Sequence, residues 1–181
     1  MINNFKLEEL PEHLSETLDR SFSEVMFKAC IVCFDSQNHR TGVSIAKYED
    51  ANNLYAGNLN INWQTEITPP LTNTFNDINR TTDYGAMCIA LILALNLSDY
   101  SYFMTSKTGT GFDFWLTNDP YGVNFEARLE ISGIRTGSST NNIKLRQKLK
   151  EKQLKQSDHL GLSTFISITE FSNPEALFLS K

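Results

Sequence analysis

The segment from Gly109 to Ile134, GTGFDFWLTNDPYGVNFEARLEISGI, constrains the fold more than any other part of the chain. Apolar and polar residues alternate on both sides of a turn-rich centre, TNDPYGVN, which is the pattern of a β-hairpin. Because side chains on a strand point to opposite faces with a period of two, one face carries charge through Asp113, Arg128 and Glu130. The other face is apolar and takes Phe112, Phe114, Leu116, Phe125, Ala127, Leu129 and Ile131.

The two acids of this hairpin are the first candidates for a functional site. If the turn closes symmetrically, Asp113 lies near Arg128 and Gly111 near Glu130, so the two carboxylates are diagonal neighbours about 7–8 Å apart at Cα. Carboxylates on adjacent strands suit a hard cation such as Mg²⁺ or Mn²⁺. The simpler interpretation is an ordinary cross-strand ion pair between Asp113 and Arg128, worth about 0.2–1 kcal/mol. The aromatic neighbours of Asp113 favour a partly buried, functional carboxylate.

Composition indicates one folded domain of the α+β class. The chain has 181 residues, of which 40% are hydrophobic, and this is enough for a proper core. We expect N-terminal helices and a hairpin over 1–80, a mixed sheet flanked by helices over 81–171, and a tail over 172–181. No secretory signal is apparent at the start, and the longest apolar run, 86–95, is too short to cross a bilayer. A cytoplasmic protein without membrane contact is therefore expected.

The three cysteines are better explained as buried apolar residues than as a metal or redox centre. Cys30 and Cys33 have the C-x-x-C spacing, but no second Cys/His pair completes a tetrahedral zinc site, and Cys88 lies in an apolar run. Nothing resembles a nucleophile–histidine signature or a phosphate-binding glycine loop.

The expected order of elements follows from periodicity and turn residues. The expected elements in chain order are helices within 7–35, strands over 43–48 and 54–67 with a turn at 49–53, a polar loop over 72–82, a helix capped by Thr81, Thr82 or Asp83 and ending near Leu97, a strand over 98–106, the hairpin, a flexible connection over 133–140, a basic helix over 144–155, a strand over 162–171, and a tail that packs down.

The basic helix is the second candidate site. Residues 144–155, KLRQKLKEKQLK, carry a net charge of +5, so the rest of this −5 chain carries −10. Leu145 and Leu149 are four residues apart and predict the contact edge of the helix. Its cations could neutralise a phosphate backbone, and the candidates for binding DNA or RNA are Lys144, Arg146, Lys148 and Lys152. A solvated lysine-rich helix explains the same pattern.

The order helix, three strands, helix, strand over residues 81–171 resembles the PD-(D/E)XK nuclease superfamily, which has the restriction-endonuclease-like fold. That resemblance implies metal-dependent hydrolysis of phosphodiester bonds, with Asp113 and Glu130 as magnesium ligands 17 residues apart. An acid on the first helix joins the site in many members, and Asp83 is the matching candidate. The helix after the third strand adds a glutamine or lysine in some members, which corresponds to Gln153 or Lys152.

One position departs from the family pattern. Ser132 occupies the place of the lysine in the Glu-x-Lys motif, and serine cannot supply a positive charge to the phosphate. Arg128 shares a strand face with Glu130 and could hold a phosphate through its fork of donors. Lys148 or Lys152 of the basic helix could also replace the missing lysine.

Two other functions fit the same residues. The domain could be a catalytically inactive nuclease-fold interaction protein, such as an accessory subunit or an immunity-type partner in a bacterial defence or toxin system. Aromatic residues and arginine, which favour interfaces, suit that hypothesis. A glycosidase using Asp113 and Glu130 as its acid pair is a remote third possibility, because few stacking aromatics accompany the pair.

Overall fold

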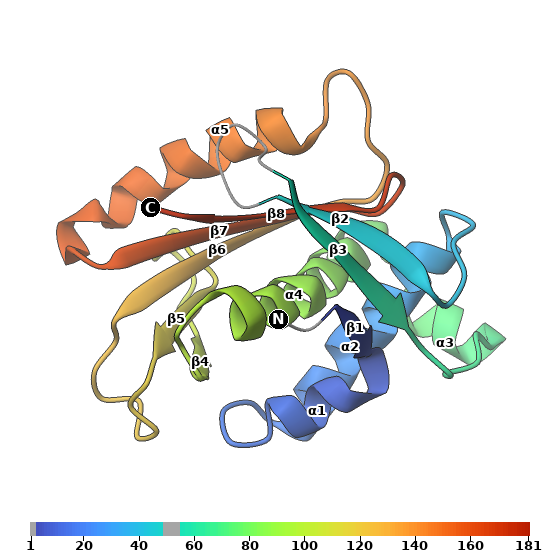
Figure 1. The fold of residues 1–181 in the computed structure, drawn as a ribbon, viewed down its shortest axis with the longest axis horizontal. Coiled ribbons are helices and arrows are strands. Elements are labelled where there is room, and N and C mark those ends of the chain that lie inside the picture. Colours follow the sequence, from blue (N-terminus) through green and yellow to red (C-terminus); the bar gives the residue numbers. More distant parts are fainter. Residues whose placement is uncertain (1–2, 49–54) are drawn as a thin grey trace.

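The computed structural model describes residues 3–48 and 55–181 and shows a mixed α/β fold (Figure 1). The predicted turn at 49–53 and the predicted strand start at 54 lie outside these residues. Within the described ranges, no helix combines the length and apolar character that a membrane span requires. The elements in chain order are β1 Asn4–Lys6, η1 Leu7–Glu9, α1 Leu10–His13, α2 Arg20–Asp35, β2 Val43–Tyr48, β3 Tyr55–Asn62, α3 Pro69–Thr74, α4 Ile78–Leu97, β4 Tyr102–Thr105, β5 Phe114–Thr117, β6 Ala127–Ile134, α5 Ile143–Leu154, η2 Lys155–Leu160, β7 Ser163–Glu170 and β8 Glu175–Ser180.

The eight strands of the described residues form a single mixed sheet in the order β1-β3-β2-β8-β7-β6-β5-β4. β4, β5 and β6 form an antiparallel meander, and β7 lies parallel to β6 after the crossover through α5. The chain from α4 to β7 therefore has the predicted order of one helix, three strands, one helix and one strand. The mixed sheet with flanking helices confirms the expected α+β class.

Helices cover both faces of the sheet and bury a separate apolar cluster on each. α2 and α4 pack together on one face, whereas α5 lies on the other (Figure 1). The alternation of β7 follows from this arrangement, because Phe165 joins the cluster on the α4 face and Ile166 joins the cluster on the α5 face. Both faces of β6 are consequently buried, which explains why polar residues on this strand are enclosed rather than exposed.

The first helix of the predicted core begins earlier than the sequence pattern indicated. Its N-cap is Asp77, whose carboxylate accepts a hydrogen bond of 3.1 Å from the amide of Arg80. The predicted caps, Thr81 to Asp83, therefore lie inside α4. The polar segment before it is partly helical as well, because Thr68 caps the short helix α3. Neither helix start was predicted from the sequence, because the polar side chains that cap helices also favour turns and loops.

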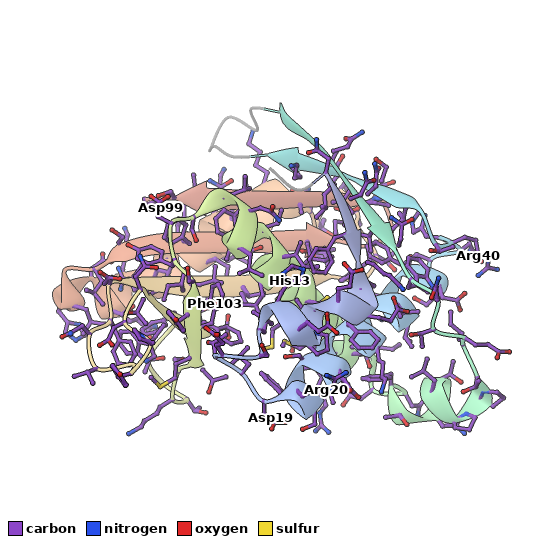
Figure 2. All side chains as sticks on the ribbon, turned by 60° about the horizontal axis from the view of Figure 1, so that its bottom comes forward. His13, Asp19, Arg20, Arg40, Asp99 and Phe103 are labelled. Carbon is purple, nitrogen blue, oxygen red and sulfur yellow. The ribbon has the colours of Figure 1, made fainter. Side chains whose placement is uncertain are left out.

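The C-terminal tail forms a central strand of the sheet rather than only packing against it. β8 pairs antiparallel with β7 and parallel with β2. It thereby joins the three N-terminal strands to the remainder of the sheet. Charged side chains without a role in this packing, such as the labelled Asp19, Arg20, Arg40 and Asp99, lie on the outside of the molecule (Figure 2).

Candidate active site

The pairing of β5 with β6 places Asp113 beside the segment that carries Glu130. Trp115 pairs with Arg128 and Phe114 with Leu129, and Asp113, which directly precedes this pairing, contacts the backbone of Leu129 and Ile131 on either side of Glu130. The predicted pairing of Asp113 with Arg128 was wrong by two residues. The turn is asymmetric because the carboxylate of Asp119 accepts hydrogen bonds from several amides on its C-terminal side, namely those of Tyr121, Val123 and Asn124.

Asp113 lies at the point where β5 begins and is held by the backbone of β6. Its amide donates to the carbonyl of Leu129 over 2.9 Å, and its Oδ2 accepts from the amide of Ile131 over 2.7 Å. The loop before it turns back at Gly111, whose φ of +85° is a conformation that glycine adopts without strain. Burial raises the pKa of Asp113, while the Ile131 hydrogen bond and the charge of Lys150 oppose that rise.

Glu130 is the most deeply buried acid of the site, with 1% of its surface exposed. Its Oε1 forms an ion pair with Lys150 Nζ. Its Oε2 is buried and accepts no hydrogen bond from any described residue. Burial and the nearby charge of Asp113 raise the pKa of Glu130 to about 7, against the opposing effect of Lys150.

Lys150 and Gln153 reach this site from α5. Besides its pair with Glu130, Lys150 Nζ lies 3.4 Å from Gln153 Oε1, and Gln153 Nε2 donates to the carbonyl of Gly111 over 3.5 Å. Gln153 thus links the lysine to the loop that carries Asp113. The structure brings the predicted Gln153 into the site, whereas sequence reasoning missed Lys150.

The reason for missing Lys150 is the orientation of α5. The predicted contact edge, Leu145 and Leu149, is 39% and 62% exposed. The face that packs on the sheet instead repeats through Ile143, Gln147, Lys150 and Leu154, at helical spacings of four, three and four. A lysine and a glutamine on that repeat were the available signal.

Asp83 lies on α4 near the two central acids. Burial raises its pKa, and the charges of Lys150 and Arg146 lower it; its own charge in turn raises the pKa of Asp113. The structure does not assemble Asp83, Asp113 and Glu130 into one ligand set. Across residues 3–48 and 55–181, no three His, Cys, Asp or Glu side chains are grouped closely enough to hold a metal ion.

A pair of carboxylates still suits Mg²⁺, which commonly takes one or two protein carboxylates and completes its shell with water and substrate oxygens. The unpartnered Oε2 of Glu130 is a buried acceptor beside Asp113. The donor set therefore fits a divalent cation held by two acids, with Asp83 nearby. A cavity of about 360 Å³ opens beside them, lined by Asp113, Glu130, Gln153 and the loop residues 105–112.

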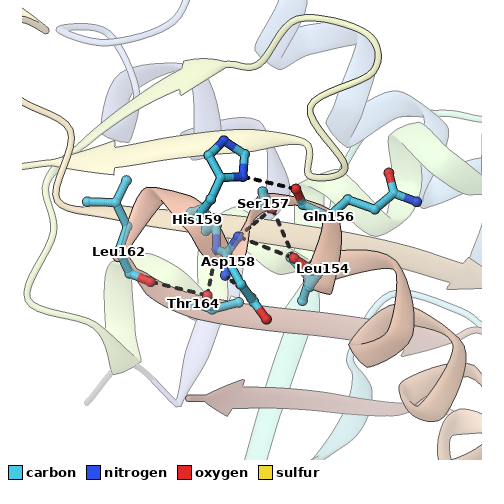
Figure 3. Close-up of polar contacts among 8 residues, drawn as sticks. Leu154, Gln156, Ser157, Asp158, His159, Leu162 and Thr164 are labelled. Atoms are coloured by element: carbon cyan, nitrogen blue, oxygen red, sulfur yellow. Dashed lines mark hydrogen bonds and ion pairs between the residues drawn. The ribbon is translucent and has the colours of Figure 1, made fainter.

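Arg128 contacts the end of α5, η2 and β7 rather than this site; Figure 3 shows its partners there, among them Leu154, Ser157, Asp158 and Thr164. Its guanidinium donates to Thr164 Oγ1 over 2.7 Å, to the carbonyl of Leu154 over 3.3 Å and to Ser157 Oγ, and it pairs with Asp158 over 2.6 Å. These contacts occupy its fork of donors and draw it away from Asp113. The simpler hypothesis of an Asp113–Arg128 ion pair is therefore contradicted.

The remaining candidates of the basic helix separate into two groups. Lys144, Lys148 and Lys152 are exposed on the outer side of α5, whereas Arg146 is half-buried and lines a cavity at the end of β6. Ser132, at the motif-lysine position, is buried on the same strand face as Glu130. The three cysteines are free and buried, and burial raises the pKa of Cys33 to about 12.

Comparisons with protein-family models, curated proteins and solved structures found no significant match to this chain.

Proposed function

We propose that this protein hydrolyses phosphodiester bonds of nucleic acid with a divalent cation bound by Asp113 and Glu130. The observation that carries the proposal is the buried acid pair with Lys150 beside it. A cation of this kind lowers the pKa of bound water and polarises a phosphate. The combination of an acid pair, a lysine and an open cavity supports hydrolysis over a purely structural role.

Each side chain of the candidate active site then has a defined role. Asp113 is aligned by the Ile131 amide, and Glu130 presents an unpartnered oxygen. Lys150 supplies the positive charge that Ser132 lacks, and such a charge stabilises the negative charge that develops on a phosphate. Gln153 is a positioning residue, because it contacts both Lys150 and the Gly111 carbonyl.

The proposal is tested by incubating the full chain with Mg²⁺ or Mn²⁺ and with labelled single- and double-stranded DNA and RNA. We expect cleavage that EDTA abolishes and that both Asp113→Ala and Glu130→Ala eliminate. Asp99→Ala is the control, since Asp99 is an exposed carboxylate outside the hairpin and outside the lining of the cavity beside the acids. Equal cleavage by the wild type and both site variants would overturn the proposal.

A second candidate function is binding without hydrolysis. The observation that favours it is the ion pair itself, because Lys150 neutralises one of the two acids. The nuclease-fold interaction protein would show no cleavage with any of these substrates and no effect of divalent cations on its melting temperature. It would also form a stable complex with a protein partner.

A further inference from the structure

The free edge of β6 continues the candidate active site towards the start of α5. β5 pairs only with residues 127–129 of β6, whereas β7 accompanies 127–134. No other strand of the described chain pairs with β6 beyond that point. The helices α4 and α5, which cover opposite faces, come close at this edge, because Asp83 of α4 and Arg146 of α5 line the same cavity.

A cavity of about 660 Å³ lies along this edge. Its lining comes from the start of α4, the end of β6 and the start of α5, and it includes Asn79, Thr82, Asp83, Arg135, Thr136 and Arg146. Each of the three elements also reaches the cavity beside the acids, through Met87 on α4, Glu130 on β6 and Gln153 on α5. The two cavities share no lining residue but lie along the same three elements, and we call the cavity of about 660 Å³ the edge trough.

The far end of the edge trough is suited to an anion. Arg146 donates to Asn141 Oδ1 over 2.8 Å, and Arg135 contacts the Cys33 sulfur over 2.9 Å and the Val32 carbonyl over 3.4 Å. These contacts use only part of the five donors of each guanidinium. Among the described residues, neither arginine lies within ion-pair distance of a carboxylate. Asp83 is the acid of the lining, and it lies towards the active-site end.

We infer that Arg146 and Arg135 form a phosphate subsite that holds the backbone of a nucleic-acid strand next to the bond at Asp113 and Glu130. This inference rests on the proposed function and gives the bound strand a path. Arg146 precedes Lys150 by one helical turn, about 6 Å along the axis, which is comparable to the spacing of adjacent phosphates in one strand. A guanidinium suits a phosphate because its forked donors match two oxygens.

The subsite is tested by the binding of fluorescein-labelled single-stranded DNA in EDTA, which prevents metal-dependent cleavage, followed by anisotropy at several salt concentrations. We expect Arg146→Ala to weaken binding about tenfold and to reduce the slope of log K against log salt by about 0.7, the value for one phosphate contact in a single strand. Lys155→Ala is the matched control, because it removes one positive charge from an exposed residue at the C-terminal end of α5. It should change Kd by less than twofold.

A second measurement locates the contact. Single methylphosphonate linkages, which remove one phosphate charge, are moved along the strand. A methylphosphonate at one position should weaken the binding of the strand to the wild type. The same substitution should not weaken binding to Arg146→Ala or Arg146→Gln any further, because the effects of removing both partners of one interaction do not add. Melting curves check that the variants are folded.

The outcomes separate this inference from the proposed function. Arg146-dependent binding without any cleavage in Mg²⁺ would support the subsite and contradict the hydrolase. Cleavage by the wild type with equal binding losses in Arg146→Ala and Lys155→Ala would overturn the subsite alone. No binding of the strand by the wild type, or no position-specific methylphosphonate effect, would also overturn it.

Discussion

Lys150 of α5 forms an ion pair with Glu130 of β6, on the strand face that also carries the buried Ser132. The lysine comes from a different element than the acid, and the two charged groups meet between the helix and the sheet. Because Glu130 is nearly inaccessible and Lys150 is only 18% exposed in its side chain, water screens their interaction weakly. This ion pair places a positive charge of the helix beside the acids of the sheet.

Removal of the Lys150 charge should impair hydrolysis more than folding. We expect Lys150→Ala to lower kcat by about 10²–10³-fold, the usual cost of removing one group that stabilises transition-state charge. Lys152→Ala, an exposed neighbour on the same helix, should retain wild-type kcat. Single-turnover cleavage with saturating Mn²⁺ measures both. Wild-type kcat in Lys150→Ala would remove the lysine from the mechanism.

The raised pKa of Glu130 predicts a specific dependence of stability on pH without metal. The folded protein keeps the proton up to about pH 7, whereas an unfolded glutamate loses it near pH 4.5, so the native state binds more protons between these values. Unfolding free energy should therefore fall as pH rises from 4.5 to 7, by roughly 3 kcal/mol from this group.

Glu130→Gln should lack that decline when urea unfolding is followed in EDTA across the same pH range. Glu151→Gln provides a control of opposite sign, because hydrogen bonding to Lys181 lowers the pKa of Glu151. Its stabilising contribution is present at neutral pH and is lost as pH falls through its lowered pKa. A Glu130→Gln profile parallel to that of the wild type would contradict the assigned pKa.

Arg128 should matter for stability and not for the active site. Arg128→Ala removes the guanidinium that donates to Thr164 Oγ1 and Ser157 Oγ and that pairs with Asp158, and we expect a loss of about 3 kcal/mol in unfolding free energy. Arg20→Ala, which breaks an exposed pair with Glu24, should cost less than about 1 kcal/mol. Urea unfolding gives both values. A catalytic role would instead appear as lost cleavage with unchanged stability.

The helices and strands that could be predicted were those with a clear periodicity of apolar residues, which is a local property of the sequence. Alternation over 109–134 predicted β5 and β6, and the apolar run 86–95 predicted α4. The hairpin register was not predictable, since it depends on how Asp119 folds the turn. The role of the tail was also hidden, because the pairing of β8 with β2 joins segments far apart in the chain.

The site was predictable in its two central acids and in Gln153, but not in its lysine. Asp113, Glu130 and Gln153 were identified from spacing and from the family resemblance, and the structure brings these three together. Lys150 was missed because Leu145 and Leu149 suggested the wrong buried face for α5, although both leucines are exposed. Arg128 was assigned to the site by strand parity alone, which gives a face but not the direction of a long side chain.

The most direct test of the account is the melting temperature of the full chain with and without Mg²⁺ or Mn²⁺, added at 5–10 equivalents or at about a hundredfold excess over Kd. By mass action, the higher level adds about 2.7 kcal/mol to the free energy of unfolding. Wild-type protein should melt at a higher temperature with the cation, and Asp113→Asn and Glu130→Gln should each lose that shift. A wild-type melting temperature that does not change with the cation would contradict a metal-binding acid pair. So would a cation-induced shift that is equally large in both variants.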